Sequence, residues 1–194
     1  MPPVLLKPDM PGTMGVYVGL LRGINVGGKN RLPMARLRDF FEQAGAKNVS
    51  TYIQSGNVVY SASSKKRAEA IARDVTELLL QEEGLAVPLL VRTQGELEKV
   101  LSMHPYLKDE ADGRMVSVVF LSSAAAASSV ASLDPHKSSG DRFLLKKKEI
   151  FLHTPNGSAR SKLTVAYFDR ALGLVSTVRN IKTVRALLEM CERA

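Results

Sequence analysis

The segment VSTYIQSGNVVY, residues 49–60, decides the fold prediction. It contains two runs rich in β-branched and aromatic residues, which favour extended backbone, and a short turn that includes Gly56 separates them. Two such runs around a glycine-bearing turn predict a β-hairpin. The residues on either side of the hairpin indicate the larger unit to which it belongs.

The flanking segments predict one strand and one helix on each side of this hairpin. Upstream, the apolar run at 15–21 is typical of a buried strand, and the apolar residues at 34–41 recur at the spacing of one helical face. Downstream, the charged segment at 65–83 carries a single apolar stripe, which predicts a helix, and 87–91 is a further strand. The order strand, helix, strand, strand, helix, strand is that of a ferredoxin-like unit, whose four-stranded antiparallel sheet has helices on one face.

The same order of elements is predicted a second time in the rest of the chain, although the two parts show no close residue-by-residue repeat. The predicted elements are a linking helix at 94–103, a strand at 115–121, a helix at 124–133, a hairpin at 142–153, a helix at 158–172, a strand at 174–178 and a last helix at 181–192. The sequence therefore predicts an α+β fold of two tandem ferredoxin-like (βαββαβ) halves with a linking helix and a C-terminal helix. The expected organisation is a flexible tail at 1–13, a first half at 14–93, a linking helix and loop at 94–113, and a second, basic half at 114–194.

The composition is that of a globular protein. The 194 residues are 45% hydrophobic and 24% charged, which is enough to build one sizeable core or two small ones. Cys191 is the single cysteine, so an internal disulfide is impossible and we expect a reducing, cytoplasmic location. The sequence has neither the apolar run of roughly 20 residues that a membrane span needs nor the apolar core of a signal peptide, and we expect no membrane partner.

The positive charge is concentrated in the second half of the chain. The formal net charge is +8; residues 1–113 contain 14 Lys and Arg against 13 Asp and Glu, whereas residues 114–194 contain 13 against 6. Such an asymmetry suggests an anionic partner, which could be nucleic acid or a small ligand. A surface whose charge only aids solubility would have the same composition.

The glycine-rich segment GINVGGKN, residues 23–30, is the first candidate ligand-binding loop. It follows a predicted strand and precedes a predicted helix, as a nucleotide-binding P-loop does. A P-loop needs a hydroxyl residue after its lysine, and Asn30 stands there instead, so the sequence disfavours a P-loop. We predict a simpler anion site made of backbone N–H groups and cations; alternatively, the glycines only supply left-handed backbone. The candidate residues of this loop are Arg22, Asn25, Gly27, Gly28, Lys29 and Asn30.

Two later loops carry cations beside predicted helix starts. In residues 155–163, Ser158 or Ser161 could cap the following helix, which would leave backbone N–H groups, Arg160 and Lys162 facing an anion. In residues 177–184, Asn180 is placed to cap the last helix, and Arg179 lies between strand and helix. Ordinary helix caps are the alternative interpretation of both loops.

The sequence names no catalytic centre. His104, His136 and His153 are far apart and share no metal-ligand spacing with one another or with Cys191. Cys191 lies beside leucines in the last predicted helix, which is typical of a packing thiol. We predict no metal site, name no catalytic residue or cofactor, and leave open whether the protein is an enzyme.

Several segments together resemble one protein family. The segments LLRGINVGGKN at 20–30, YIQSGNV at 52–58, SKL at 161–163 and TVRN at 177–180 resemble a bacterial domain-of-unknown-function family, number 1697. The resemblance extends over nearly the whole chain from Met14 and adds Ser55 and Asn57 to the candidate ligand-binding residues. It implies a small bacterial cytoplasmic α+β protein of ferredoxin-like character with no established activity. The family often has an aromatic residue after its Arg-Asn pair, where this chain has Ile181.

The best prediction of function is binding of a small anionic ligand, phosphorylated or nucleotide-like. Four cations from separate loops are expected to converge on it: Arg22, Lys29, Lys162 and Arg179. One alternative is RNA or DNA binding, because tandem ferredoxin-like units often bind RNA, although an aromatic content of 6% offers few side chains for stacking bases. Another alternative is a non-enzymatic interaction module or homo-oligomer.

Overall fold

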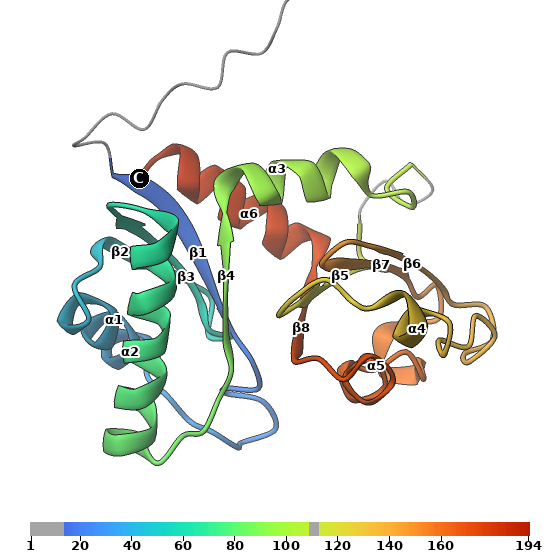
Figure 1. Cartoon of the computed structure of the whole chain (residues 1–194), viewed down its shortest axis with the longest axis horizontal. Helices are drawn as coiled ribbons and strands as arrows, with labels where there is room; N and C mark the ends of the chain where they lie inside the picture. The colour runs from blue at the N-terminus through green and yellow to red at the C-terminus, as the bar shows by residue number, and fades with distance from the viewer. Residues whose placement is uncertain (1–13, 109–112) are drawn as a thin grey trace, which may run out of the picture.

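The computed structural model describes residues 14–108 and 113–194 (Figure 1). The predicted tail at 1–13 lies outside the described residues. The first half contains β1 (Gly15–Leu21), α1 (Met34–Gln43), β2 (Lys47–Tyr52), β3 (Asn57–Ala62), α2 (Lys65–Glu83) and β4 (Leu89–Thr93). Its sheet has the strand order β2-β3-β1-β4, and every neighbouring pair is antiparallel.

The second half repeats this topology. It contains β5 (Val116–Leu121), α4 (Ala127–Val130), β6 (Arg142–Lys146), β7 (Glu149–His153), the short 3-10 helix η1 (Ser158–Arg160), α5 (Val165–Leu172) and β8 (Ser176–Asn180). Its sheet has the order β6-β7-β5-β8, again antiparallel throughout. One more helix follows each sheet, α3 (Gln94–Met103) and α6 (Ile181–Glu192). The predicted α+β fold of two ferredoxin-like halves is therefore confirmed.

Two predicted helices of the second half differ from the structure. The helix expected at 124–133 is reduced to the four residues of α4, none of which is buried, because an Ala- and Ser-rich segment has no large side chains to pack. The helix expected at 158–172 begins only at Val165, where the hydroxyl of Thr164 accepts a hydrogen bond from the Tyr167 backbone N–H at 3.2 Å. Neither Ser158 nor Ser161 caps it, since the Ser161 hydroxyl accepts from the Leu163 N–H.

Side chains on both faces of the two sheets are buried in three clusters. One cluster joins the first sheet to α1 and α2 through residues such as Phe40 and Tyr60, and another packs the second sheet on α5 through Phe168. The third contains the inner faces of both sheets, represented by Val59 and Phe151, together with α3 and α6. Figure 1 shows these two helices lying across one end of the sheets, while the loop after β1 lies at the other end. The halves therefore share a core.

The hairpin between β2 and β3 packs on the end of β1. Gly56 has a φ of +72°, and a Cβ atom there would lie 2.7 Å from Cβ of Leu21, so both the backbone and the space require glycine. Its carbonyl accepts a hydrogen bond from the Leu21 N–H at 2.8 Å. This close approach places Ser55 and Asn57 beside the start of the glycine-rich loop.

Two arginines at matching positions connect the halves reciprocally. Arg92 is the fourth residue of β4 and donates from Nη2 to the carbonyl of Leu121, the last residue of β5, at 2.7 Å. Arg179 is the fourth residue of β8 and donates from Nη2 to the carbonyl of Leu21, the last residue of β1, at 2.5 Å. Since each half gives the other the same contact, an approximate two-fold relation connects them.

The described residues were also compared with the requirements of a membrane-spanning helix and of a metal site. None of the described helices combines the length and the apolar character that crossing a membrane requires. The described part of the chain contains no group of three or more His, Cys, Asp or Glu side chains that could hold a metal ion.

Candidate functional site

The glycine-rich loop is braced by its own asparagines. The amide of Asn25 donates to the carbonyls of Leu32 at 2.9 Å and Gln54 at 2.8 Å, and its oxygen accepts from the Leu32 N–H at 2.9 Å. The amide of Asn30 donates to the carbonyl of Gly23 at 2.9 Å. Both asparagines have a positive φ, at 54° and 49°, which this residue type tolerates better than most. Their side chains therefore hold the loop in one shape.

The tip of this loop is a tight turn. The Lys29 N–H donates to the carbonyl of Val26 at 3.0 Å, and Gly27 and Gly28 between them have φ values of 57° and 76°. Two consecutive left-handed residues are typical of a type I′ turn, which glycine forms without steric cost. The side chain of Lys29 is exposed at this tip.

A cavity of about 400 Å³ lies where the glycine-rich loop meets the second half, and we call it the Arg179 cavity. Its lining residues are Arg22, Gly23, Ile24, Val26, Ser55, Val165, Thr177, Val178, Arg179, Asn180 and Thr183. Four of the candidate residues from the sequence, Arg22, Ser55, Arg179 and Asn180, are thus brought together in one place.

Arg179 is buried in the wall of this cavity. Its guanidinium donates to Asn57 Oδ1 at 2.5 Å, Thr177 Oγ1 at 2.8 Å and the carbonyls of Val178 at 2.8 Å, Leu21 at 2.5 Å and Ser55 at 3.2 Å. These acceptors are all neutral, and no described carboxylate forms an ion pair with Arg179. Burial lowers the pKa of Arg179 to about 10, so the guanidinium stays protonated at neutral pH.

Arg22 is the more accessible cation of the cavity. It forms an ion pair with Asp169 of α5, which joins the glycine-rich loop to the second half, and its side chain is 33% exposed. The other oxygen of Asp169 accepts a hydrogen bond from the Ser176 hydroxyl at 2.6 Å. Arg22 is therefore the partly exposed cation of the cavity, and its ion pair with Asp169 would have to open for a ligand to take its place.

The first turn of α6 forms another side of the cavity. The side chain of Asn180 accepts from the Lys182 N–H at 2.9 Å and so caps the helix as predicted, and its amide donates to the carbonyl of Arg114 at 3.0 Å. The first turn contains no acidic residue, and Thr183 lines the cavity. The partial positive charge of a helix N-terminus therefore adds to that of the arginines.

Comparison with known proteins identifies the family. A family model described as "Protein of unknown function (DUF1697)" matches residues 14–151. The chain belongs to this family. A similar solved structure is that of the conserved bacterial protein SP0830 from Streptococcus pneumoniae, with a TM-score of 0.68, 23% sequence identity, and coverage of 92% of this chain and 99% of that chain. That likeness shows a shared fold. No curated protein matches.

The remaining candidate residues of this DUF1697 protein lie apart from the Arg179 cavity. Asn25 and Gly28 line a shallow pocket on the outer side of the loop, and Gly27, Lys29 and Asn30 are exposed at or near its tip. Ser161 lines an adjoining cavity of about 220 Å³, which shares Val165 and Val178 with the first, while the side chain of Lys162 is exposed. Asn57 lies behind Arg179 and is fully buried. Of the four cations expected to converge, only Arg22 and Arg179 line the Arg179 cavity.

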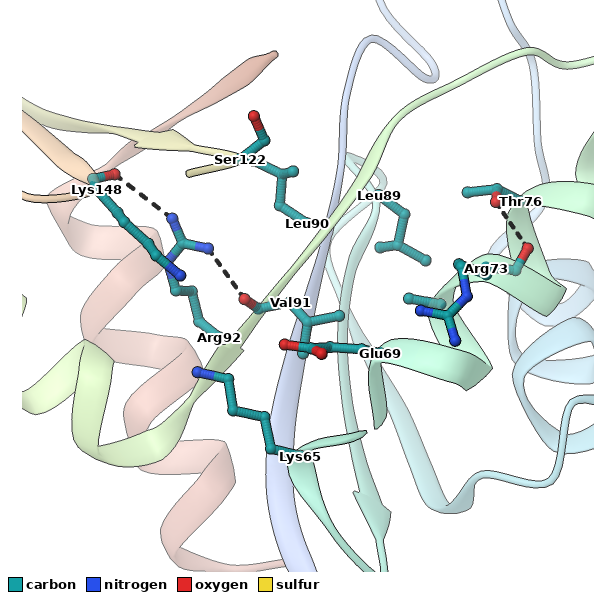
Figure 2. A pocket seen from close by; sticks show the side chains of 11 residues that line it. Lys65, Glu69, Arg73, Thr76, Leu89, Leu90, Val91, Arg92, Ser122 and Lys148 are labelled. Carbon is teal, nitrogen blue, oxygen red and sulfur yellow. Dashed lines mark hydrogen bonds between the residues drawn. The ribbon is translucent and has the colours of Figure 1, made fainter. Parts of the chain in front are cut away.

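A second cavity, which we call the Arg92 cavity, was not predicted from the sequence. It has a volume of about 270 Å³ and lies along β4, where Lys65, Arg73, Arg92 and Lys148 line it together with Glu69. Figure 2 shows Arg92 extending from β4 toward the backbone carbonyl of Lys148. A sequence signal for it exists, because Val91-Arg92 before the Thr93 cap of α3 matches Val178-Arg179 before the Asn180 cap of α6.

Proposed function

We propose that this DUF1697 protein binds a small ligand carrying a phosphate or similar anionic group in the Arg179 cavity. The observation that carries the proposal is the buried guanidinium of Arg179, whose described acceptors are all neutral. A buried charge interacts with a nearby ion far more strongly than an exposed one, because little water lies between them. An anion in the cavity would supply the counter-charge that Arg179 lacks.

The other walls of the cavity support this proposal. Arg22 offers a guanidinium that can form two parallel hydrogen bonds to a phosphate, and the hydroxyl of Thr183 lies at the N-terminus of α6. Ile24, Val26 and Val178 provide apolar surface for the rest of a ligand. A volume of about 400 Å³ is in the range of small-ligand sites.

Nucleic-acid binding has less support from the architecture. Ferredoxin-like proteins that bind single-stranded RNA stack bases on an open sheet face, but buried side chains occupy both faces of the central strands β1 and β5. The positive charge of residues 114–194 is then better suited to attracting a small anion toward the cavity.

The proposal is tested by isothermal titration calorimetry with inorganic pyrophosphate at low ionic strength. We expect binding by the wild-type protein and a roughly tenfold or greater loss of affinity in Arg22→Gln, since a charge-assisted hydrogen bond contributes about 1.5–3 kcal/mol. Lys29→Gln is the matched control, because it removes the same charge from the exposed loop tip and should change affinity less than twofold. Absence of binding by the wild type, or equal losses in both variants, would overturn the proposal.

A second titration separates this function from nucleic-acid binding. Fluorescence anisotropy with a short single-stranded RNA compares the wild-type protein with a variant in which Lys146, Lys147 and Lys148 are replaced by alanine. We expect only weak binding, abolished by moderate salt. Tight binding that the triple substitution removes would favour nucleic acid over the small anion.

A further inference from the structure

The residues that face the two reciprocal arginines are at matching positions but differ in charge. Asn57 is the first residue of β3, and Glu149 is the first residue of β7. Arg179 donates from Nε to Oδ1 of Asn57 at 2.5 Å, and Arg92 donates from Nε to Oε1 of Glu149 at 3.3 Å. The same donor atom thus contacts a neutral amide in one place and a carboxylate in the other.

This difference changes the net charge around the buried arginine of each cavity; the Arg92 cavity is also lined by Lys65, Arg73, Lys148 and Glu69. In the Arg92 cavity the ion pair with Glu149 neutralises the buried guanidinium, and both side chains are largely buried, with exposed fractions of 4% and 14%. In the Arg179 cavity the amide of Asn57 satisfies the hydrogen bond but adds no negative charge. All five N–H groups of Arg179 have neutral acceptors, so Arg179 attracts a ligand anion by its unpaired charge, and the carboxylate of Asp169 pairs with Arg22 instead. An anion in the Arg92 cavity would meet a guanidinium whose charge Glu149 already neutralises.

Both the N–H donors and the oxygen acceptor of the Asn57 side-chain amide take part in hydrogen bonds. Its Nδ2 donates to the Ser55 hydroxyl at 2.9 Å and to the Tyr52 carbonyl at 3.2 Å, while its oxygen accepts from Arg179. The side chain is fully buried, so these contacts hold its orientation. An aspartate would have the same shape and would place a carboxylate oxygen where the amide oxygen now contacts the guanidinium.

We propose that Asn57 and Glu149 determine which of the two related cavities accepts an anion: the amide of Asn57 leaves the Arg179 cavity receptive, and the carboxylate of Glu149 closes the Arg92 cavity. This inference rests on the proposed function of the Arg179 cavity. Asn57 acts through Arg179, so it is a positioning residue that sets specificity and has no direct contact with the ligand.

The test uses two isosteric exchanges of opposite charge, with pyrophosphate binding followed by calorimetry. Asn57→Asp should lower the affinity of the Arg179 cavity tenfold or more, because the new carboxylate pairs with Arg179. It also loses the hydrogen bond that Nδ2 donates to the Tyr52 carbonyl. Asn57→Ala loses the same amide contacts but adds no carboxylate, so it should keep most of the affinity; an equal loss of affinity in both variants would show a purely structural role of Asn57. Glu149→Gln should keep the wild-type affinity of the Arg179 cavity and add a second, weaker binding event at the Arg92 cavity.

The outcomes separate this inference from the proposed function on which it rests. Lack of pyrophosphate binding by the wild-type protein overturns both. Wild-type binding with unchanged affinity in Asn57→Asp overturns the inference alone and leaves the Arg179 cavity as the site. If Asn57→Asp does not fold, Glu149→Gln decides: a binding stoichiometry that stays at one overturns the inference, and a second event that disappears in the double variant Glu149→Gln with Arg92→Gln supports it.

Discussion

Arg92 and Arg179 occupy the same position in the last strand of their respective halves, and each donates a hydrogen bond to the last residue of the other half's first strand. Each arginine also donates from Nη1 to the carbonyl of the residue before it, Val91 or Val178. The hydrogen bonds to Leu121 and Leu21 connect the edge strand of each sheet to a central strand of the other sheet. The two halves therefore stabilise each other through polar contacts as well as through the shared core.

Removal of the Arg179 side chain is predicted to destabilise the whole chain. Arg179→Ala leaves the buried side-chain oxygen of Asn57 without the Arg179 donor, and it leaves the buried carbonyl of Leu21 with only the 3.5 Å contact from the Thr177 hydroxyl. Unsatisfied buried polar groups cost about 1–3 kcal/mol each, so we expect the free energy of unfolding to fall by roughly 2–4 kcal/mol, measured by urea denaturation. Arg160→Ala, at an exposed position of η1, is the control and should change stability by less than about 0.5 kcal/mol. Equal effects of the two substitutions would contradict a connecting role for Arg179.

Gly56→Ala is predicted to weaken the contact between the hairpin and β1. The added Cβ would lie 2.7 Å from Cβ of Leu21 on a backbone with a φ of +72°, so both strain and overlap oppose it, at roughly 1–3 kcal/mol of stability. Gly95→Ala, in α3 with open space around it, should leave stability unchanged or raise it by up to about 1 kcal/mol. Thermal unfolding followed by circular dichroism compares the pair, and a Gly56 variant as stable as wild type would show that the turn can relax.

His104 is predicted to make stability depend on pH. Burial is the main cause that lowers the pKa of His104 below its ordinary value of 6.5, and the nearby His153 adds to it. The unfolded chain therefore binds this proton more tightly than the folded protein, so stability is full above the unfolded pKa and falls as pH decreases toward the folded pKa. Urea denaturation near pH 7.5 and near pH 5.5 measures the change.

A pair of variants assigns this pH effect to His104. His104→Gln should lose less stability than wild type between the two pH values, since glutamine does not titrate. His136→Gln removes an exposed histidine and should leave the wild-type pH dependence intact. The assignment fails if wild type and His104→Gln lose the same amount.

Cys191 is predicted to be unreactive in the folded protein. The residue is 4% exposed, and burial, reinforced by Glu192 and Glu98, raises the pKa of Cys191 to about 11. Because the thiolate is the reacting species, Ellman's reagent at pH 8 should react slowly with the native protein and stoichiometrically in urea. Rapid modification of the native protein would show that α6 opens readily.

Much of the fold could be predicted from local sequence. The order of elements was predicted from the hairpin at residues 49–60 and from the spacing of apolar residues on either side of it. These signals are local, because a hairpin or a helical face depends on residues within one strand pair or a few helical turns. The two errors, at 124–133 and 158–172, have different causes. The first segment is rich in Ala and Ser and has no large side chains to pack, so only a four-residue helix forms. In the second, the Lys162 N–H donates to the distant Ser138 hydroxyl at 3.0 Å, and such a contact leaves no trace in a local pattern.

The candidate site was predicted less completely. Sequence reasoning selected both cations of the Arg179 cavity, but it also expected Lys29 and Lys162 there, since a charge on a loop does not indicate its direction. It selected Asn57 only through a family motif and passed over Arg92 and Glu149. Arg92 belongs to the first half and Glu149 to the second, and the role of each depends on the opposite charge of the other. Residues so far apart in the sequence show no sign of this pairing in a local pattern.

The sequence by itself determined the alternation of strands and helices, the glycine positions that turns require and the Asn180 cap of α6, because these depend on backbone preferences and on residues a few positions apart. Only the tertiary structure decided that Arg179 is buried against Leu21 and Asn57, that Arg92 faces Glu149, and that a cavity lies beside each arginine. Those contacts join residues from opposite halves, and they arise from the packing of two sheets around a shared core, which no local pattern encodes.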